Sequence, residues 1–174
     1  MSIETQQITL DEARRVAFRR LKPEDESLLM AIYESTRLEE MALTGWGQAQ
    51  REAFVKMQFE AQQLHYGKYY PEGRHLIILL NDEPVGRLYV AETGEDLHVL
   101  DITILPQYRG AGIGTPIIEL LMRRAAEIDK PLHIYVENYN RSHRLFERLG
   151  FVKVGESGGN DLLEWRPQDK AFDF

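Results

Sequence analysis

The chain contains no cysteine. Disulfides, thiolate metal ligands and cysteine nucleophiles are therefore excluded. Long apolar runs are also missing, because the longest aliphatic run, 76–80, is far shorter than the roughly 20 residues that a membrane-spanning helix needs. The N-terminal segment lacks the charged and then apolar order of a signal peptide. These features predict a cytoplasmic protein with no membrane partner.

Positive charge is scarce. The chain has 21 Lys and Arg against 28 Asp and Glu, which gives a formal net charge of -7. This balance argues against a nucleic acid as the main partner, because a phosphate backbone attracts basic surfaces. Internal repeats, low-complexity tracts and linkers rich in Gly, Ser or Pro are absent as well. We therefore expect a single domain over residues 1–174.

Apolar patterns of helical spacing alternate with short strand-like runs along the chain. Proline and acidic residues at 23–26 are typical of a helix start, and turn-forming residues at 81–84 are typical of a hairpin loop. The expected elements are strand 16–21, a helix from 23 to about 38–42, helix 48–66, strands 75–80, 85–91 and 97–105, helix 113–128, strand 131–136, helix 141–149, and strands 151–154 and 161–165.

This order predicts an α+β domain with a mostly antiparallel mixed sheet of about 6–7 strands flanked by about four helices. Helix 113–128 connects strands 97–105 and 131–136, so these two strands must run parallel to each other. Such a pair can splay apart. Its open ends, together with the N-terminus of the connecting helix, then form a cleft where a ligand is expected.

A glycine-rich segment lies between strand 97–105 and the helix that follows it. Residues 109–115 read RGAGIGT, with glycine at every second position. Glycine lets a ligand approach the backbone, and the free amides at a helix N-terminus bind phosphate. The spacing differs from both the Gly-x-Gly-x-x-Gly dinucleotide loop and the Gly-x-x-x-x-Gly-Lys phosphate loop. The segment is interpreted either as a pyrophosphate site or as a flexible turn.

The residues around this loop resemble the GNAT superfamily of N-acetyltransferases. Residues 102–114, ITILPQYRGAGIG, contain the family's Arg/Gln-x-x-Gly-x-Gly/Ala signature, and residues 140–151, NRSHRLFERLGF, are similar to its Asn-led helix ending in Leu-Gly-Phe. The likeness is firm over 101–154 and loose over 18–25. It implies a GNAT-like domain with acceptor-side helices at about 24–66, a cofactor-binding core at about 97–154 and a C-terminal hairpin at about 151–166.

The resemblance implies transfer of an acetyl group from acetyl-CoA to a primary amine of a small molecule or peptide, by direct attack on the thioester. It also implies that strand 102–105 pairs with the pantetheine arm, that the loop amides hold the pyrophosphate, and that Asn140 lines the cofactor channel. The expected cofactor-binding residues are Ile104, Leu105, Arg109, Gly110, Ala111, Gly112, Ile113, Gly114, Thr115 and Asn140.

Attack on a thioester needs a neutral amine, so a base must take a proton. His98 is one candidate because it begins the strand beside the thioester and is expected to share a face with Ile102; alternatively it is a solvated surface residue. Asp101, expected on the opposite face, is the other candidate, or else a structural carboxylate that caps backbone amides. The remaining histidines lack ligand-like spacing, so no metal is expected.

Phe146 stands where many members of the family carry a tyrosine that protonates the leaving thiolate. Phenylalanine cannot donate a proton, and Tyr139 is the candidate substitute. A thiolate also leaves tolerably without help, since the pKa of a thiol is about 8.5. The same departure from the family supports an alternative function, a CoA-binding sensor or interaction domain with little or no turnover.

The acceptor site is expected between the helices of 24–66 and the hairpin strand that follows them. Acidic and aromatic side chains there suit an ammonium group by charge and by cation–π contact. A solvated helix surface with one core tryptophan is the alternative interpretation, and a homodimer is left open. The candidate acceptor-binding residues are Tyr33, Arg37, Glu40, Trp46 and Tyr89.

Overall fold

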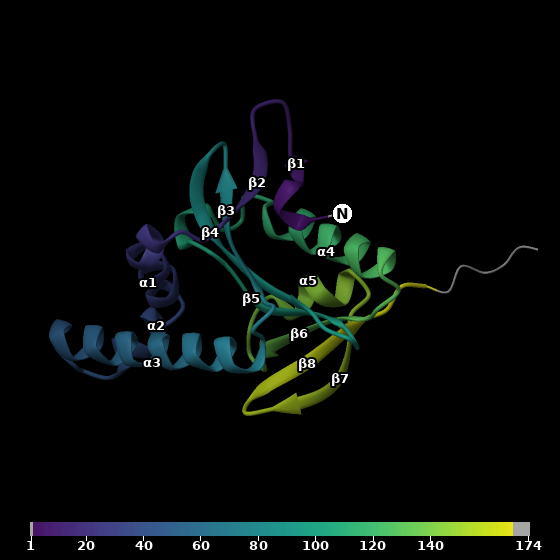
Figure 1. Cartoon of the computed structure of the whole chain (residues 1–174). Helices are drawn as coiled ribbons and strands as arrows, with labels where there is room; N and C mark the ends of the chain where they lie inside the picture. The colour runs from purple at the N-terminus through teal and green to yellow at the C-terminus, as the bar shows by residue number, and fades with distance from the viewer. Residues whose placement is uncertain (1, 169–174) are drawn as a thin grey trace, which may run out of the picture.

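The computed structural model describes residues 2–168, which form one eight-stranded mixed sheet and five α-helices (Figure 1). The strand order is β1-β2-β3-β4-β5-β6-β8-β7. The strands are β1 (Gln7–Thr9), β2 (Arg15–Arg20), β3 (Arg74–Leu80), β4 (Glu83–Glu92), β5 (Leu97–Ile104), β6 (Leu132–Glu137), β7 (Val152–Ser157) and β8 (Asn160–Trp165). The α-helices are α1 (Glu26–Ser35), α2 (Leu38–Leu43), α3 (Gln48–Tyr69), α4 (Gly114–Glu127) and α5 (His143–Arg148).

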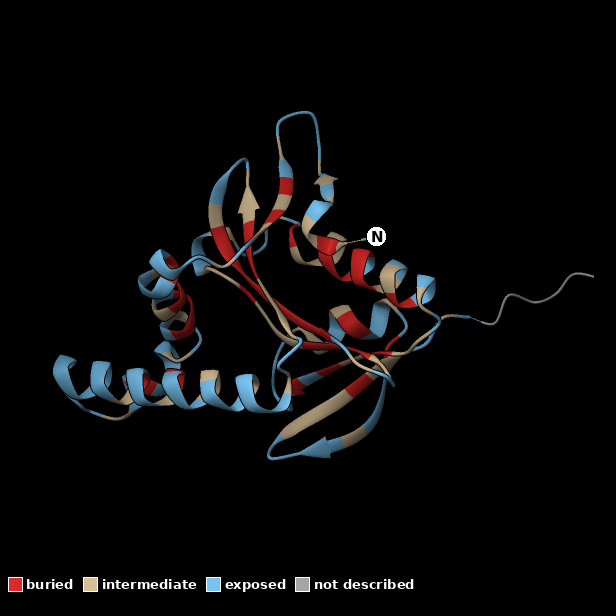
Figure 2. Cartoon of the chain, viewed as in Figure 1, coloured by how far each residue is buried: buried red, intermediate tan, exposed pale blue. Residues whose placement is uncertain are grey.

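Two hydrophobic cores lie on opposite faces of the sheet. Leu76 and Ile78 of β3 pack in the core that contains α4, whereas Ile77 packs with Leu29 of α1 and Phe59 of α3. Alternate residues of a strand point to opposite faces, so a strand covered on both sides is apolar throughout. Figure 1 shows α1, α2 and α3 gathered on one side of the sheet and α4 on the other. Figure 2 shows buried residues concentrated in the central strands and the inner side of α4.

The expected hairpins are present. Asn81 and Asp82 connect β3 to β4 with φ angles of 48° and 69°. Gly158 and Gly159 connect β7 to β8 with φ angles of 57° and 81°. Two consecutive residues with positive φ form a turn whose twist matches that of the flanking strands. Asn, Asp and Gly are the residues that adopt this conformation at least cost.

The sheet has more strands, and the chain more helices, than the sequence predicted. β1 was not expected, because it has three residues and none of them is buried. The first helix was expected to run to 38–42, but it is interrupted at Thr36 and resumes as α2. The hydroxyl of Thr36 donates to the carbonyl of Tyr33 at 2.6 Å, and its backbone N–H bonds the same oxygen at 3.0 Å. This local capping ends the α-helical ladder.

None of the helices within residues 2–168 is long and apolar enough to cross a membrane.

Candidate active site

β5 and β6 separate after a short parallel pairing, as the sequence predicted. Residues 97–99 of β5 pair with 132–134 of β6. Beyond Val99, β5 remains paired with β4 and β6 remains paired with β8, but the described residues form no further β5–β6 pairs. The facing edges therefore offer N–H and C=O groups to an extended ligand.

The glycine-rich loop follows the open end of β5. Gly110 and Gly112 have φ angles of 71° and 77°, a region that other residues rarely adopt. Within residues 2–168, no backbone N–H between 110 and 113 donates to a backbone carbonyl in a turn or loop. These amides precede the positive end of the α4 dipole. They can therefore bind an anion such as a pyrophosphate.

Two arginines stabilise this loop by donating hydrogen bonds to backbone carbonyls. Arg14, on the β1–β2 hairpin, donates from Nη1 to the carbonyl of Ala111 at 2.7 Å and forms an ion pair with Asp11. The Nε atom of Arg109 donates to the carbonyl of Ile104 at 2.9 Å. Arg109 was expected at the cofactor site, whereas Arg14 was missed, since its contact spans most of the chain and depends on a hairpin that the sequence did not predict.

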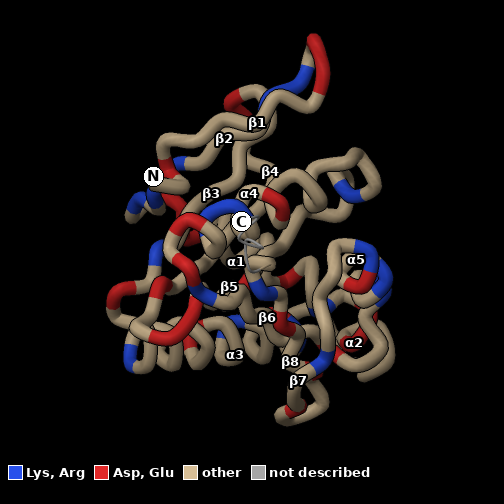
Figure 3. The backbone as a smooth tube through the Cα atoms, turned by 90° about the vertical axis from the view of Figure 1, so that its right-hand side faces the viewer, with Lys and Arg blue, Asp and Glu red and all other residues tan. Residues whose placement is uncertain are grey.

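Basic residues gather along and beside α5, which follows β6 (Figure 3). Arg141, Arg144 and Arg148 are all exposed, and one acidic residue, Glu147, lies among them. The amide oxygen of Asn140, also expected at the cofactor site, accepts the backbone N–H of Ser142 at 2.9 Å. Asn140 therefore stabilises the turn that leads into α5.

An extra residue in β5 changes the direction of its side chains. The β4–β5 register shifts so that Leu100 has no partner on β4. A bulge of this kind reverses the alternation of side chains beyond it. The expected opposite orientation of His98 and Asp101 is therefore wrong, since both lie on the face toward α3. Ile102, which was expected to share a face with His98, packs in the core on the other side.

Asp101 is engaged by side chains. Its carboxylate forms an ion pair with Arg87, whose Nε lies 2.8 Å away, and it accepts the hydroxyl of Thr103 at 2.7 Å. Arg87 is fully buried and also donates to Gln62 of α3 at 2.6 Å. The expectation that Asp101 caps backbone amides is wrong, because no backbone N–H of the described residues donates to its carboxylate. Its oxygens are already occupied, which makes a role as a base less favourable.

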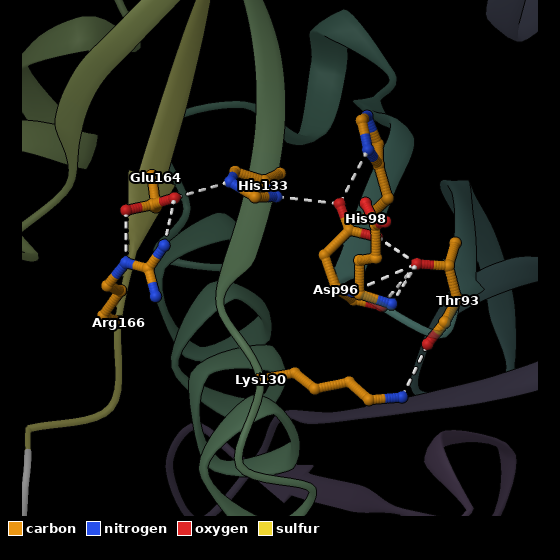
Figure 4. Close-up of polar contacts among 8 residues, drawn as sticks. Thr93, Asp96, His98, Lys130, His133, Glu164 and Arg166 are labelled. Atoms are coloured by element: carbon orange, nitrogen blue, oxygen red, sulfur yellow. Dashed lines mark hydrogen bonds and ion pairs between the residues drawn. The ribbon is translucent and has the colours of Figure 1, made fainter.

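His98 is buried, with 8% of its surface exposed, so the alternative of a solvated surface residue is wrong. Its Nδ1 atom lies 3.3 Å from a carboxylate oxygen of Asp96 (Figure 4). The rings of Tyr70, at the end of α3, and Tyr135, on β6, each lie 5.7 Å from the imidazole ring. His98 therefore lies at the closed end of the β5–β6 cleft. It pairs with His133, and the next residue, Val99, forms the last pair between the two strands.

Three of the expected acceptor residues lie together. Arg37 lies over the ring of Tyr33 at 5.4 Å, with its Nε atom 3.4 Å from the Tyr33 hydroxyl. Its Nη1 atom lies 3.1 Å from Glu40 and 3.9 Å from Glu137 at the end of β6. The connection between α1 and α2 thus reaches across to the strand that forms the far side of the cleft.

The other two expected acceptor residues make different contacts. Trp46 packs edge-on against Phe54 at 5.2 Å and is 40% exposed. Tyr89 is buried, where it stacks on His75 with ring centroids 4.5 Å apart.

Tyr66 of α3 contacts β5 at the bulge. Its hydroxyl donates to the carbonyl of Leu100 at 3.0 Å, directly at the bulge, and its ring packs edge-on against Tyr89. Burial raises the pKa of Tyr66, so the hydroxyl stays protonated as a donor. The partner of this hydroxyl could not be predicted from the sequence, because the contact with Leu100 depends on the bulge.

Comparison with known proteins identifies the family. The model described as Acetyltransferase (GNAT) family matches residues 29–151. The chain belongs to the GNAT acetyltransferases. A curated N-alpha-acetyltransferase from Sulfurisphaera tokodaii is 33% identical over 60 residues, which cover 33% of this chain and 36% of that protein. The match thus spans little more than a third of that relative.

Solved structures share the GNAT fold at low sequence identity. The PaiA N-acetyltransferase from Thermoplasma acidophilum in complex with coenzyme A has a TM-score of 0.66 at 15% identity, over 87% of this chain and 99% of that one. An acetyltransferase from Thermus thermophilus has a TM-score of 0.61 at 24% identity, over 87% of this chain and 97% of that one. These likenesses show the fold of this GNAT protein.

This GNAT chain lacks a phenolic hydroxyl at the position of Phe146. Phe146 is 3% exposed and packs edge-on against Phe151 at 5.1 Å. Tyr139 is 99% exposed. The role of Tyr139 as a substitute proton donor stays a prediction.

Proposed function

We propose that this protein transfers an acetyl group from acetyl-CoA to a primary amine of a small molecule or peptide. The observation that carries the proposal is the β5–β6 cleft, which opens directly onto the amides of 110–113 at the start of α4. Membership of the GNAT family and the coenzyme A complex of the Thermoplasma relative support the same donor. The net charge of -7 supports an acceptor other than a nucleic acid, and we propose action in the cytoplasm.

Each part of acetyl-CoA has a chemical match in this proposal. The amides of the loop would hold the pyrophosphate, and the exposed arginines around α5 suit the remaining phosphate by charge. The open edge of β5 up to Leu105 would pair with the amides of the pantetheine arm. A backbone N–H facing the thioester carbonyl would then stabilise the oxyanion, a contribution of about 2.7–4 kcal/mol to the barrier.

In the chemical step the amine nitrogen attacks the thioester carbon and the carbon–sulfur bond breaks. The amine proton passes to His98, directly or through water, and coenzyme A leaves as the thiolate. We prefer His98 to Asp101 because the oxygens of Asp101 are engaged by Arg87 and Thr103. Tyr66 would hold the bulge in place through the Leu100 carbonyl.

The acceptor would approach from the face covered by α1, α2 and α3. Arg37, Tyr33 and Glu137 lie at this edge of the cleft, where their charge and aromatic surface can orient the acceptor. The N-alpha-acetyltransferase relative supports peptide α-amines as the first acceptors to test.

Thermal melting with acetyl-CoA, followed by thiol release with a panel of peptides and small amines, tests the proposal. A melting temperature that rises with acetyl-CoA concentration is expected, because ligand binding to the native state stabilises it. Thiol release with at least one amine is also expected. No shift at millimolar acetyl-CoA contradicts the proposal, and a shift without thiol release across the panel supports a CoA-binding sensor instead.

The choice of base makes a separate prediction. In wild-type protein, kcat/KM is expected to fall at low pH as the base becomes protonated, and His98→Ala should remove this limb and lower the rate by at least about 10²-fold. His65→Ala, at an exposed position of α3, is the matched control and should keep the profile. If His98→Ala keeps the limb while Asp101→Asn loses activity in a folded protein, Asp101 is the base.

A further inference from the structure

A chain of polar contacts links β5, β6 and β8 beside the closed end of the cleft (Figure 4). Asp96, in the turn before β5, lies 3.3 Å from His98 and 2.8 Å from the Nδ1 atom of His133 on β6. The Nε2 atom of His133 lies 2.8 Å from Glu164 on β8. Arg166 closes the chain by donating to Glu164 at 2.6 Å.

The hydrogen-bonding capacity of each group decides which atom donates and which accepts in these contacts. His133 lies between two carboxylates, and it satisfies both only when both ring nitrogens carry hydrogen. The Oδ2 atom of Asp96 therefore accepts from His133 and remains an acceptor toward His98. A neutral His98 can donate to that oxygen only from Nδ1, which leaves the lone pair on Nε2.

Asp96 itself is held on its other side. The hydroxyl of Thr93 donates to Oδ1 at 2.5 Å, and Thr93 is fixed in turn by Lys130, which donates to its carbonyl at 2.6 Å. Burial alone would raise the pKa of Asp96, but hydrogen bonds from His98, Thr93 and His133 outweigh it and hold the pKa well below its usual range. The carboxylate is thus charged and fixed in place.

The Nε2 atom of His98 remains available. Within the described part of the chain it makes no hydrogen bond, and the side chain keeps 11% exposure. The rings of Tyr70 and Tyr135 each lie 5.7 Å from the imidazole ring. The titratable and charged groups around His98 are Asp96 and Lys130 near the turn, Tyr70 after α3, His133 and Tyr135 on β6, and Glu164 and Arg166 from the β8 end.

We propose that Asp96 is the positioning residue that fixes His98 with hydrogen on Nδ1 and a free lone pair on Nε2, and that His133 and Glu164 hold Asp96 in this role. The base role of His98 rests on the proposed acetyl transfer. When Nε2 takes the amine proton, the resulting imidazolium keeps its Nδ1–H···Asp96 hydrogen bond. The carboxylate then stabilises the charge that the reaction creates, as in other carboxylate–histidine pairs.

Asp96→Asn tests this assignment with two measurements. Long-range ¹H–¹⁵N spectra of labelled protein should show neutral His98 with hydrogen on Nδ1 in wild type and a loss of this preference in the variant. In kinetics, kcat should fall by about 10²-fold, the lower end of a general base contribution, while the KM for acetyl-CoA stays unchanged. In a His98→Ala background, Asp96→Asn should have no further effect on kcat.

Glu92→Gln is the matched control. Glu92 ends β4 near the same turn and pairs with Arg124 at 2.8 Å, so the substitution removes a carboxylate without touching His98. It should leave the His98 spectrum and the pH profile unchanged. If Asp96→Asn does not fold, Asp96→Glu, which keeps the charge but displaces it by one methylene, carries the same two measurements.

The outcomes separate the inference from the proposed function. The same His98 tautomer in wild type and a folded Asp96 variant overturns the inference, and so does an equal loss of rate with and without His98. Wild-type protein that acetylates no amine contradicts the proposed function. The spectra then decide the inference alone, because a tautomer that depends on Asp96 supports the positioning role and an unchanged one refutes it.

Discussion

Glycine at position 112 has a backbone conformation and a location that both matter for binding. Its φ is 77°, and a Cβ atom there would meet nothing within 4 Å. A valine therefore costs about 1–2 kcal/mol of backbone strain, and its side chain would project into the space proposed for the pyrophosphate. We expect Gly112→Val to weaken acetyl-CoA binding at least about tenfold by calorimetry.

Gly45→Val is the control for strain. Gly45, between α2 and α3, also has positive φ, 68°, and open space around its Cβ position. It should lower the melting temperature to a similar extent and leave acetyl-CoA affinity unchanged. Wild-type affinity in a folded Gly112→Val protein refutes the assignment of this loop as the pyrophosphate site.

Phe146→Tyr adds the hydroxyl that many GNAT members have at this position. Phe146 is buried against Phe151, so a new hydroxyl without a partner would cost about 1–3 kcal/mol. A thiolate is already a fair leaving group, since the pKa of a thiol is about 8.5. We therefore expect a lower melting temperature and less than about a tenfold gain in turnover. A gain of about a hundredfold with the same amine shows that thiolate departure limits the rate.

At the scale of elements, β4 and β5 are cross-linked by the ion pair of Arg87 and Asp101. Asp101→Asn leaves the fully buried Arg87 charge without its counter-charge, a change that typically costs about 3–5 kcal/mol. Urea unfolding should show this loss, and the double variant Arg87→Met with Asp101→Leu should recover much of it. Asp11→Asn, in an exposed ion pair, should have a much smaller effect. An unchanged unfolding free energy in Asp101→Asn contradicts the structural role.

The local pattern of apolar and polar residues was sufficient to predict most helices and strands. β3 and β5 were expected at 75–80 and 97–105 and are observed at Arg74–Leu80 and Leu97–Ile104. The helix expected at 48–66 continues three residues further, to Tyr69. The two strands were predictable because each is a short, largely apolar run that follows turn-forming residues, and the helix because its apolar residues recur at helical spacing. The parallel pair was predictable because a helix connects its two strands.

The contacts around His98 could not be predicted in this way. The bulge at Leu100 depends on the register with β4, and the sequence carries no local mark of a register shift. The contact of Asp96 with His133 joins residues 37 positions apart and requires the exact alignment of β5 with β6. The loop motif identified the cofactor side, whereas the acceptor side depends on such long-range geometry.

For the molecule as a whole, stability should fall in two stages as pH decreases. Burial lowers the pKa of His75 from 6.5 to about 4. Between these pH values the unfolded chain binds more protons than the folded chain, so the free energy of unfolding decreases as pH falls. The hydrogen bond from Arg19 lowers the pKa of Asp25 from 3.8 to about 2, with the same sign at lower pH. Melting temperatures should show that His75→Phe flattens the first stage and that Asp25→Asn reduces the second, to which the lowered pKa of Asp96 also contributes. A curve of unchanged shape in both variants contradicts this account.

The brief pairing of β5 with β6 also has a mechanical consequence. Within the described residues, the backbone ladder that joins β1–β5 to β6–β8 consists of residues 97–99 against 132–134, reinforced by the side-chain link from His133 to Asp96. A pulling force applied between the β3–β4 turn and the β7–β8 turn is carried across this seam. Rupture should therefore begin there and divide the sheet along the cleft. An extended ligand bound to the edges of both β5 and β6 would add hydrogen bonds across the cleft and raise the force needed to separate the two parts of the sheet.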